Sequence, residues 1–267
     1  MRQLILRPGA IGDCLLSWPA LQHLVTDYTE IWISSPVAPL VRFAQNVRPL
    51  SATGIDLVAV GDREMPPELR DRLKSFDSIV SWYGANRPDF RAALEEVGVP
   101  CEFLPALPPA DYPGHASTFF TGQVGAADSA PRLDIEPTDE KPDIVIHPFS
   151  GSKQKNWPLA SYQPVAAKLP GKVAWLAGPE EALAGARRFD GLHALARWMK
   201  SARLYIGNDS GITHLAAAIG VPALALFGPT DPKKWAPRGD HVMVVREDPI
   251  GQLAPERVLE AANRLLG

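Results

Sequence analysis

The sequence predicts an α/β protein made of two parallel-sheet domains, and three observations support this prediction. Short apolar runs alternate with helical patterns along the chain. A polar, proline-dotted stretch from 126 to 142 lacks periodicity, and the alternation resumes directly after it. Alternating strands and helices favour parallel sheets with helices on both faces. The aperiodic stretch is typical of a linker, so we assign 1–141 to one domain and 142–267 to a second.

The expected elements follow the alternation in order. In the first domain the strands are 3–7, 30–34, 56–60, 77–82 and 101–104, and the helices are one from Asp13 to about Val25, then 36–46, 66–74, 88–98 and 113–125. In the second domain the strands are 143–147, 172–177, 203–207, 222–227 and 241–245, and the helices run from Pro158 through Leu169, from Leu192 to Ser201, from about Ser210 to Ala218, and over 255–266. The last of these carries its leucines, Val258 and Ala262 on one apolar face, as a helix packed on a sheet does.

The composition is that of a globular protein. The chain has 267 residues, 46% of them hydrophobic, and a formal net charge of −3, which argues against a basic nucleic-acid-binding surface. A strand beginning at residue 3 leaves no room for a signal peptide, and no apolar run is long enough for a membrane span. Cys14 and Cys101 lie far apart without metal or redox spacing, and the six histidines are scattered. We therefore expect a cytoplasmic protein without a metal site or cofactor.

The most informative stretch runs from Ile206 to Ala218. An apolar strand breaks at Gly207-Asn208 and a helix of small residues follows, with Asp209 or Ser210 as its cap. The first free amides of such a helix, here those of Ser210 and Gly211, suit an anionic ligand. The Asp209 carboxylate can accept hydrogen bonds from sugar hydroxyls. The alternative is that this turn serves only as a helix cap.

A similar strand-turn-helix pattern occurs at the amino terminus, in Pro8-Gly9-Ala10-Ile11-Gly12-Asp13. The two glycines allow a sharp turn and a close approach to a ligand. Asp13 follows the first strand, at the edge where open α/β sheets bind their ligands. The motif lacks the third glycine of a dinucleotide fingerprint and the Gly-Lys-Ser/Thr of a Walker loop. Asp13 is thus either a catalytic carboxylate or an ordinary N-cap.

The third pattern follows the strand that ends at His147. A polar loop contains Ser150, Gly151, Ser152 and Lys155, and a new helix begins near Pro158. Hydroxyls, a flexible glycine and a lysine near a helix start can clamp a pyrophosphate. The alternative is a solvated loop with surface lysines. We interpret His147 itself as structural.

Together these segments resemble glycosyltransferase family 9, the bacterial ADP-heptose:lipopolysaccharide heptosyltransferases. The resemblance rests on blocks that occur in the family's order: 9–21, 155–158, Gly178-Pro179-Glu180-Glu181, 208–218 and 226–232. It implies the GT-B fold, in which two Rossmann-like domains face a central cleft. Asp13 would then lie on one side of the cleft, and Lys155 and Asp209 on the other. In many such proteins the terminal helix, here 255–266, crosses back to pack on the first domain.

The resemblance also implies roles for these residues in an inverting, metal-independent transfer of a sugar. Asp13 would be the general base, and Lys155 would neutralise the departing ADP. The expected donor-binding residues are Gly12, Ser150, Gly151, Ser152, Glu180, Glu181, Asp209, Ser210, Gly211 and His214. Glu180 or Glu181 would bind the ribose, and which of the two does so stays open. His214 would lie near the phosphates, with a structural histidine as the alternative. The absence of any Asp-x-Asp triplet argues against a metal-dependent design.

The implied partners are a nucleotide-sugar donor, ADP-heptose first among them, and a saccharide or lipid-linked saccharide acceptor at the cytoplasmic face of the inner membrane. Residues 35–125 contain no motif that identifies the acceptor. The region 182–192 is shorter than in the family, and this region normally helps to wall the nucleotide. The alternatives are therefore the same fold with a different donor or acceptor, a non-catalytic nucleotide-binding homologue, and a sugar epimerase of the same fold.

Overall fold

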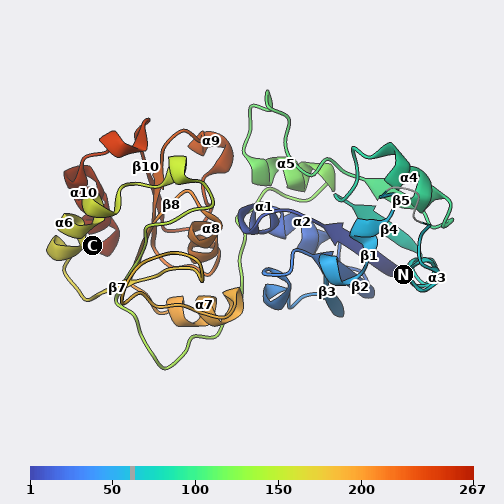
Figure 1. The fold of residues 1–267 in the computed structure, drawn as a ribbon, viewed down its shortest axis with the longest axis horizontal. Helices are drawn as coiled ribbons and strands as arrows, with labels where there is room; N and C mark the ends of the chain where they lie inside the picture. The colour runs from blue at the N-terminus through green and yellow to red at the C-terminus, as the bar shows by residue number, and fades with distance from the viewer. Residues whose placement is uncertain (61–63) are drawn as a thin grey trace. The chain divides into compact units, whose positions relative to one another are not determined.

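The computed structural model describes residues 1–60 and 64–267 and contains two parallel sheets (Figure 1). The chain divides into two compact units. The first comprises Met1–Tyr112 and Ser117–Asp128, and the second Pro113–Ala116 and Ser129–Gly267. Each unit contains one five-stranded sheet, which confirms the predicted α/β class. In the described ranges, no helix is both long and apolar enough to cross a membrane.

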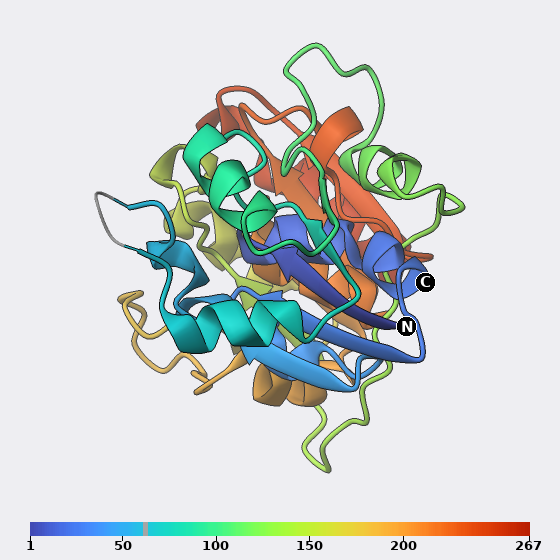
Figure 2. The ribbon, with the colours of Figure 1, turned by 90° about the vertical axis from the view of Figure 1, so that its right-hand side faces the viewer.

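The first unit has the strand order β3-β2-β1-β4-β5, with parallel pairing throughout. Its strands are β1 (Arg2–Arg7), β2 (Tyr28–Ile33), β3 (Asn46–Pro49), β4 (Ser78–Ser81) and β5 (Cys101–Phe103). Its helices are α1 (Ile11–Leu16), α2 (Trp18–His23), α3 (Pro67–Lys74), α4 (Pro88–Glu95) and α5 (Ala116–Gln123), with short 3₁₀ turns η1 (Ala38–Leu40), η2 (Leu50–Ala52) and η3 (Ile55–Leu57). Figure 2 shows α3, in teal, in front of the blue strands. Leu4, Leu6, Trp32 and Phe90 belong to the core beneath these helices.

Two elements predicted in this unit are wrong. The segment 36–46 is not a helix, because Pro36 and Pro39 allow only the short turn η1, and the strand β3 starts at Asn46. The segment 56–60 is not a strand: Gly54 adopts a φ of +75° and the chain turns into η3. The true edge strand β3 contains asparagine, arginine and proline, which are weak signals for a strand. Its pairing with β2 defines it instead.

The helix expected from Asp13 to Val25 is divided at Ser17. The α1 helix ends at Leu16 and α2 begins at Trp18. Pro19 lies in the first turn of α2, where its missing N–H costs nothing, whereas in one continuous helix it would remove a hydrogen bond. The break leaves α1 as a short helix that carries Asp13 directly behind β1.

The second unit has the order β10-β9-β8-β6-β7, again all parallel. Its strands are β6 (Ile144–His147), β7 (Val173–Trp175), β8 (Leu204–Asn208), β9 (Ala223–Phe227) and β10 (Val242–Arg246). Its helices are α6 (Leu159–Lys168), α7 (Leu192–Met199), α8 (Gly211–Ala218), α9 (Pro232–Trp235) and α10 (Pro255–Leu266), with the turns η4 (Lys153–Lys155) and η5 (Ile250–Gln252). These strands agree with the predicted ones to within two residues at each end.

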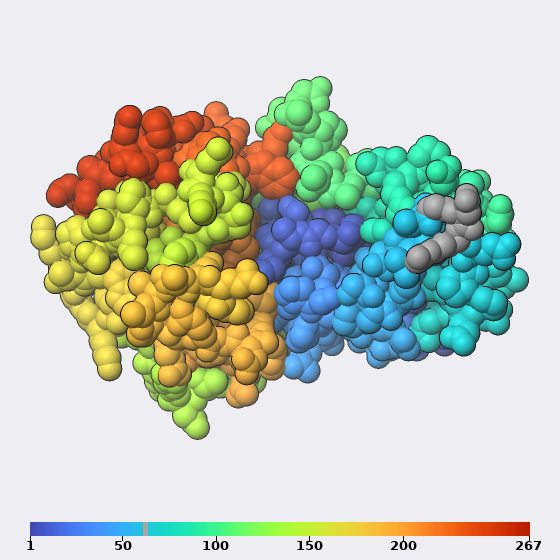
Figure 3. Space-filling view, viewed as in Figure 1, coloured from blue at the N-terminus to red at the C-terminus, as the bar shows by residue number. Residues whose placement is uncertain are grey.

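The helix α10 packs beside α6 on the sheet of its own unit (Figure 1). Val258 and Ala262 are fully buried there among the strand residues Ile146 and Ile206. The resemblance allowed this helix to cross to the first domain, but its apolar face is taken up by the second sheet. In Figure 3 the red surface near residues 250–267 lies against the yellow-green surface near 150–157. The Trp157 indole N–H donates to the carbonyl of Leu253, which joins these two segments.

The segment expected to be a free linker is largely part of the second unit. The units divide at Asp128/Ser129, whereas the sequence places the boundary at 141/142. Leu133 and Ile135 are buried, and the Leu133 amide donates to the carbonyl of Ala218 at 2.9 Å. The Arg197 guanidinium donates to the carbonyl of Glu136. These anchors hold an extended chain on α7 and α8, although its polar, proline-rich composition is typical of a linker.

Each sheet has one point at which the strand order reverses. In the first unit this point lies between β1 and β4, and in the second between β6 and β8. Open α/β sheets bind ligands outside the carboxyl ends of the strands at such a point. The residues that follow β1, β6 and β8 lie at these points, and they are the three patterns singled out in the sequence.

Candidate functional site

The segments after β6 and β8 meet at an ion pair between Lys155 and Asp209. The lysine Nζ lies 2.7 Å from the aspartate Oδ2. The Asp209 side chain is only 7% exposed, whereas that of Lys155 is 33% exposed. A carboxylate this well buried requires a positively charged partner. The structure thus brings together two residues that the sequence singled out separately, and the lysine keeps a face toward solvent.

Asn208 explains why Lys155 reaches this position. Its side-chain oxygen accepts the backbone N–H of Trp157 at 3.0 Å and the hydroxyl of Tyr162 at 2.9 Å. The Trp157 ring is buried in the core of the second unit. Asn208 directly precedes Asp209, and Trp157 lies two residues after Lys155. The bond between them therefore holds the Lys155 loop next to Asp209. The buried Trp157 thus anchors the loop and positions the lysine.

The Ser150-Gly151-Ser152 segment forms the bend ahead of Lys155. The Ser150 hydroxyl lies 2.8 Å from the carbonyl oxygen of Ser152 and 2.7 Å from Oδ1 of Asn156. This hydroxyl therefore shapes the loop. Gly151 is exposed, and the space where a Cβ would project from it is open. Ligand contact by these three residues stays a prediction.

The helix α8 begins directly beside the ion pair. Ser210 is its N-cap, because the Ser210 hydroxyl oxygen accepts the amide of Thr213 at 3.4 Å. The sequence left the cap open between Asp209 and Ser210, and the structure selects Ser210. The Asp209 side chain pairs with Lys155 instead. The amide of Gly211 opens the helix, so the positive end of the helix and the lysine lie at one place.

His214 lies on the first turn of α8 and is 7% exposed. Burial lowers its pKa to about 4; Asp209 acts in the opposite direction, while His115 and Lys155 lower the pKa further. The ring is therefore neutral at neutral pH. As a neutral ring it can still donate one hydrogen bond to an anion.

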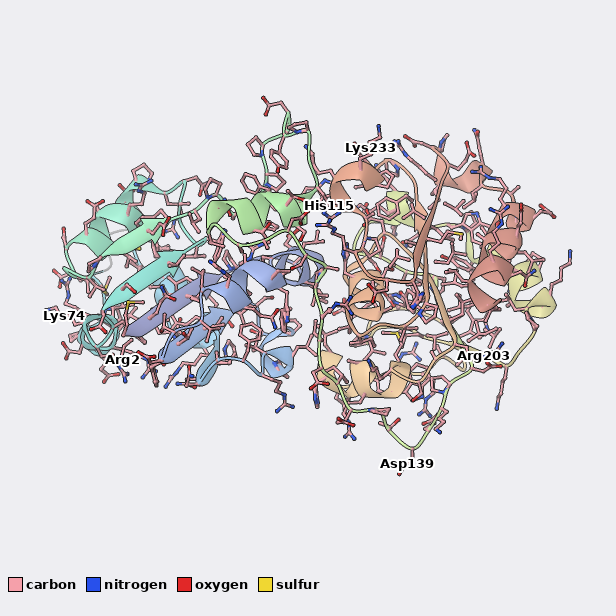
Figure 4. All side chains as sticks on the ribbon, turned by 180° about the vertical axis from the view of Figure 1, so that it is seen from behind. Arg2, Lys74, His115, Asp139, Arg203 and Lys233 are labelled. Atoms are coloured by element: carbon pink, nitrogen blue, oxygen red, sulfur yellow. The ribbon has the colours of Figure 1, made fainter. Side chains whose placement is uncertain are left out.

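His115 is a residue that the sequence did not reveal as part of this region. It belongs to the short segment 113–116 that is part of the second unit. Its Nε2 lies 2.9 Å from the carbonyl oxygen of Ala236, directly after α9, the helix that carries Lys233 (Figure 4). A lone histidine between glycine and alanine gives no local signal, and only the fold brings it near His214.

The structure treats Glu180 and Glu181 differently. Glu180 is exposed, whereas Glu181 folds back onto the end of β7, where its Oε2 accepts the Gly178 amide at 2.6 Å. The same oxygen lies 3.1 Å from Nε2 of His147. Burial raises the pKa of Glu181, but the bonds from His147 and Gly178 outweigh burial and hold the pKa below its usual range. His147, interpreted as structural, thus contacts a predicted site residue.

Asp13 lies in the first turn of α1 and is not its N-cap. Ala10 occupies the cap position, and its amide donates to Oδ2 of Asp13 at 3.2 Å. The alternative that Asp13 is the N-cap is therefore wrong, although its side chain accepts the amide of the residue that is. Gly9 turns the chain with a φ of +122°, and a Cβ there would lie 3.2 Å from the Asp13 Cβ. Gly12 is the second residue of α1, beside Asp13.

Arg7, the last residue of β1, fixes the start of α1. Its buried guanidinium donates to Oγ of Ser17 at 2.7 Å and to the backbone carbonyl of Asp13 at 2.9 Å. The same group lies 4.6 Å from the centre of the Phe120 ring. In the sequence Arg7 looks like an ordinary strand residue, and a single charge at the end of an apolar strand is the signal that could have identified it.

Potential metal ligands do not gather in the described part of the chain: across 1–60 and 64–267, no three His, Cys, Asp or Glu side chains form a group that could hold a metal ion. The cation beside the buried carboxylate Asp209 is the side chain of Lys155.

Two parallel sheets, each with a carboxylate following a strand at its reversal point, define a two-domain α/β protein of the GT-B class. Solved structures share this fold. A glycosyltransferase of family 9 from Veillonella parvula is 18% identical with a TM-score of 0.75, covering 99% of this chain and 97% of that one. The E. coli ADP-heptose LPS heptosyltransferase II is 18% identical with a TM-score of 0.73, covering 100% and 98%. An E. coli heptosyltransferase solved with ADP gives 18% and 0.69, covering 99% and 100%.

The family model of glycosyltransferase family 9 (heptosyltransferase) matches residues 111–263, and the chain belongs to this family. Among curated relatives, lipooligosaccharide heptosyltransferase 2 of Haemophilus influenzae is 32% identical over 79 residues, which is 23% of this chain and 23% of the relative. Lipopolysaccharide heptosyltransferase 3 of Escherichia coli is 42% identical over 65 residues, 24% of this chain and 18% of the relative. The matched stretches thus cover less than a third of each relative's length.

Proposed function

We propose that this protein transfers a heptose from ADP-heptose to an acceptor of the lipopolysaccharide-core type, with inversion at the anomeric carbon and without a metal ion. The observation that carries the proposal is the Lys155–Asp209 ion pair at the start of α8. A departing diphosphate needs positive charge and free amides at one place, and this arrangement offers both. Membership of family 9 and the relative solved with ADP support the choice of donor.

In the second unit, Lys155 and the amides at the start of α8 would bind the diphosphate, together with the 150–152 loop. His214 would donate one hydrogen bond to it as a neutral ring. Asp209, held by Lys155, would accept hydroxyl hydrogen bonds from the sugar. Binding of the diphosphate places its negative charge beside Asp209, so Lys155 must serve both anions. This need explains a lysine that is paired yet one-third exposed.

In the first unit, Asp13 would be the general base. An acceptor hydroxyl attacks the anomeric carbon, its proton passes to the Asp13 carboxylate, and the bond between that carbon and the ADP oxygen breaks. A single displacement of this kind inverts the anomeric configuration. The Ala10 amide and the Arg7 guanidinium hold α1 and its carboxylate in place, which suits a base that must be oriented before reaction. Gly12 beside Asp13 leaves room for a substrate.

We place this reaction at the cytoplasmic face of the inner membrane, where a lipid-linked acceptor would be available to a protein in peripheral contact with the bilayer.

The second candidate function is transfer from a different nucleotide sugar, and one observation favours it. Residues 182–191 contain no helix; Arg187 pairs with Leu176 beside β7 and Phe189 packs on Trp198. This short connection leaves less material to wall a base than a full helix and strand would.

The direct test is a transfer assay with purified protein, ADP-heptose and a deacylated lipopolysaccharide core, carried out with and without EDTA. We expect a product heavier by one heptose residue, unchanged by EDTA, with inverted anomeric configuration by NMR. A thermal-shift panel of ADP-, UDP- and GDP-sugars should show stabilisation by ADP-heptose. Stabilisation by a UDP- or GDP-sugar alone would support the second candidate, and no stabilisation by any nucleotide sugar would refute a donor site.

A further inference from the structure

A line of buried polar groups runs from Glu181 to the start of α8. The His147 ring lies 3.1 Å from Glu181 Oε2 through Nε2 and 3.5 Å from the Tyr205 hydroxyl through Nδ1. The Tyr205 hydroxyl lies 3.3 Å from Oγ1 of Thr213, which in turn lies 3.1 Å from the Ser210 hydroxyl. His147 is 4% exposed, and Tyr205 and Thr213 are fully buried. Buried polar groups that satisfy one another in this way hold a single arrangement.

The bonds to Glu181 fix only one of its two oxygens. The Gly178 amide and the His147 ring both meet Oε2, and within the described residues no protein group donates to Oε1. The missing side chain of Gly178 makes room for this arrangement, because a Cβ there would lie 3.3 Å from the Glu181 carboxyl carbon. The lowered pKa keeps the carboxylate ionised, so it can only accept. Oε1 is therefore oriented and charged, and on a side chain that is 27% exposed it keeps its capacity to accept hydrogen bonds from hydroxyl groups.

The same bonds determine the tautomer of His147. An ionised carboxylate accepts hydrogen bonds, so Nε2 must carry the proton. In the neutral ring Nδ1 is then an acceptor, and the Tyr205 hydroxyl lies on that side as its donor. Gly207 allows Tyr205 to reach this position, since a Cβ on Gly207 would lie 2.4 Å from the tyrosine oxygen. Tyr205 thus orients the ring that orients Glu181.

We propose that His147 is a positioning residue for the nucleoside of the donor: it holds Glu181 so that Oε1 accepts the hydrogens of the ribose 2′,3′-diol. The inference rests on the proposed function, because it requires a nucleoside diphosphate at α8. It also selects Glu181 over Glu180, which is exposed and is not held by His147. Through Tyr205 and Thr213 the ribose site and the diphosphate site share one polar line, so both are ordered before the ligand arrives.

The test compares the affinities of the whole protein for ADP and for 2′,3′-dideoxy-ADP by calorimetry. Hydrogen bonds to a charged acceptor are worth about 1.5–3 kcal/mol, so the wild-type protein should prefer ADP by roughly tenfold to 150-fold. In His147→Ala and in Glu181→Gln this preference should fall to about threefold or less. The affinity for dideoxy-ADP should change little in both. The double variant should lose no more than either single one, because both act on the same contact.

His147→Gln protects the test against a folding defect. Its amide can donate toward Oε2, so this variant should keep an intermediate preference for ADP and a melting temperature nearer to that of the wild type. His241→Ala is the matched control, an exposed histidine of the same unit, and should leave the preference unchanged. A histidine that only stabilises the fold would weaken both ligands equally.

The outcomes separate the inference from the proposed function. If the wild-type protein binds neither ADP nor inorganic pyrophosphate, the diphosphate site itself fails. If ADP binds and His147→Ala keeps the full preference over dideoxy-ADP, the positioning role fails while the diphosphate site stands. A loss of preference in Glu180→Gln with none in Glu181→Gln would likewise overturn the inference.

Discussion

Replacing Lys155 by alanine removes the cation that pairs with the buried Asp209 carboxylate. Under the proposed function it also removes a cation that binds the diphosphate. Two unit charges about 4 Å apart interact by ~4 kcal/mol at an effective dielectric constant of about 20. The lysine is one-third exposed, so solvent reduces this value. A loss of ~1.5–3 kcal/mol is the expected result, equivalent to roughly tenfold to 150-fold weaker binding of ADP. Calorimetry at low and high salt measures this loss, which should shrink as salt rises.

The structure adds a second variant that makes this prediction sharper. In Lys155→Ala the Asp209 carboxylate is left unpaired and repels the diphosphate, so Lys155→Ala with Asp209→Asn should recover part of the lost ADP affinity. Lys153→Ala is the matched control, an exposed lysine two residues earlier in the same loop, and its ADP affinity should stay within about threefold of the wild type. Unchanged ADP binding in Lys155→Ala, or an equal loss in Lys153→Ala, would contradict the reasoning.

Three further predictions concern the chemistry, the pH dependence and the cap. Asp13→Asn keeps an oxygen that can accept the Ala10 amide, but the new side chain cannot take up a proton. Turnover should therefore fall by about 10²–10⁴ while the melting temperature and the ADP affinity barely change. Steady-state assays and calorimetry check this, and full activity would exclude Asp13 as the base. His214 titrates near pH 6.5 when unfolded and near pH 4 when folded, so the unfolded chain takes up a proton first as the pH falls. The free energy of unfolding should therefore fall by up to ~3 kcal/mol as the pH is lowered from about 6.5 to 4. Urea titrations at several pH values measure this fall, and His214→Asn should make it smaller. An equally large fall in the variant would show that other groups cause the pH dependence. Ser210→Ala should lower the free energy of unfolding by ~0.5–2 kcal/mol, because the Thr213 amide loses the Ser210 hydroxyl as an acceptor and keeps only the Ser210 carbonyl. Ser210→Thr should restore the stability, and equal stability of both variants would refute the cap.

The sequence predicts those parts of the fold whose pattern is local. Strands such as β6 and β8 are continuous apolar runs, which buried parallel strands require, and α10 carries its apolar face at helical spacing. The failures lie at the edge of the first sheet. There β3 is polar and contains Pro49, and it becomes a strand only because β2 offers a partner. Residues 56–60 have the composition of a strand, but they pair with no strand of the described sheets and begin within the turn η3.

The site could be predicted only as far as each residue's role depends on its own segment. Lys155 and Asp209 each stand out in their loops, but nothing in the sequence shows that they pair, because Asn208 and Trp157 create that contact through the core. Glu180 and Glu181 are equivalent in sequence, and the bonds from His147 and from the Gly178 amide to Glu181 distinguish them. Tertiary contacts, rather than spacing, therefore decide which residue of a motif is held in place.

In both units a charged or polar side chain at the end of a central strand holds a neighbouring segment of the candidate site in place. Arg7 of β1 holds the start of α1 with Asp13, and Asn208 of β8 holds the loop that carries Lys155. Both strands border the reversal point of their sheet. Open α/β sheets bind their ligands at that point, so a side chain that ends such a strand can be buried and still hold the segment next to a ligand. Arg7→Ala should therefore displace the Asp13 carboxylate and lower turnover, and Asn208→Ala should displace Lys155 and weaken ADP binding, although neither residue is proposed to touch a substrate.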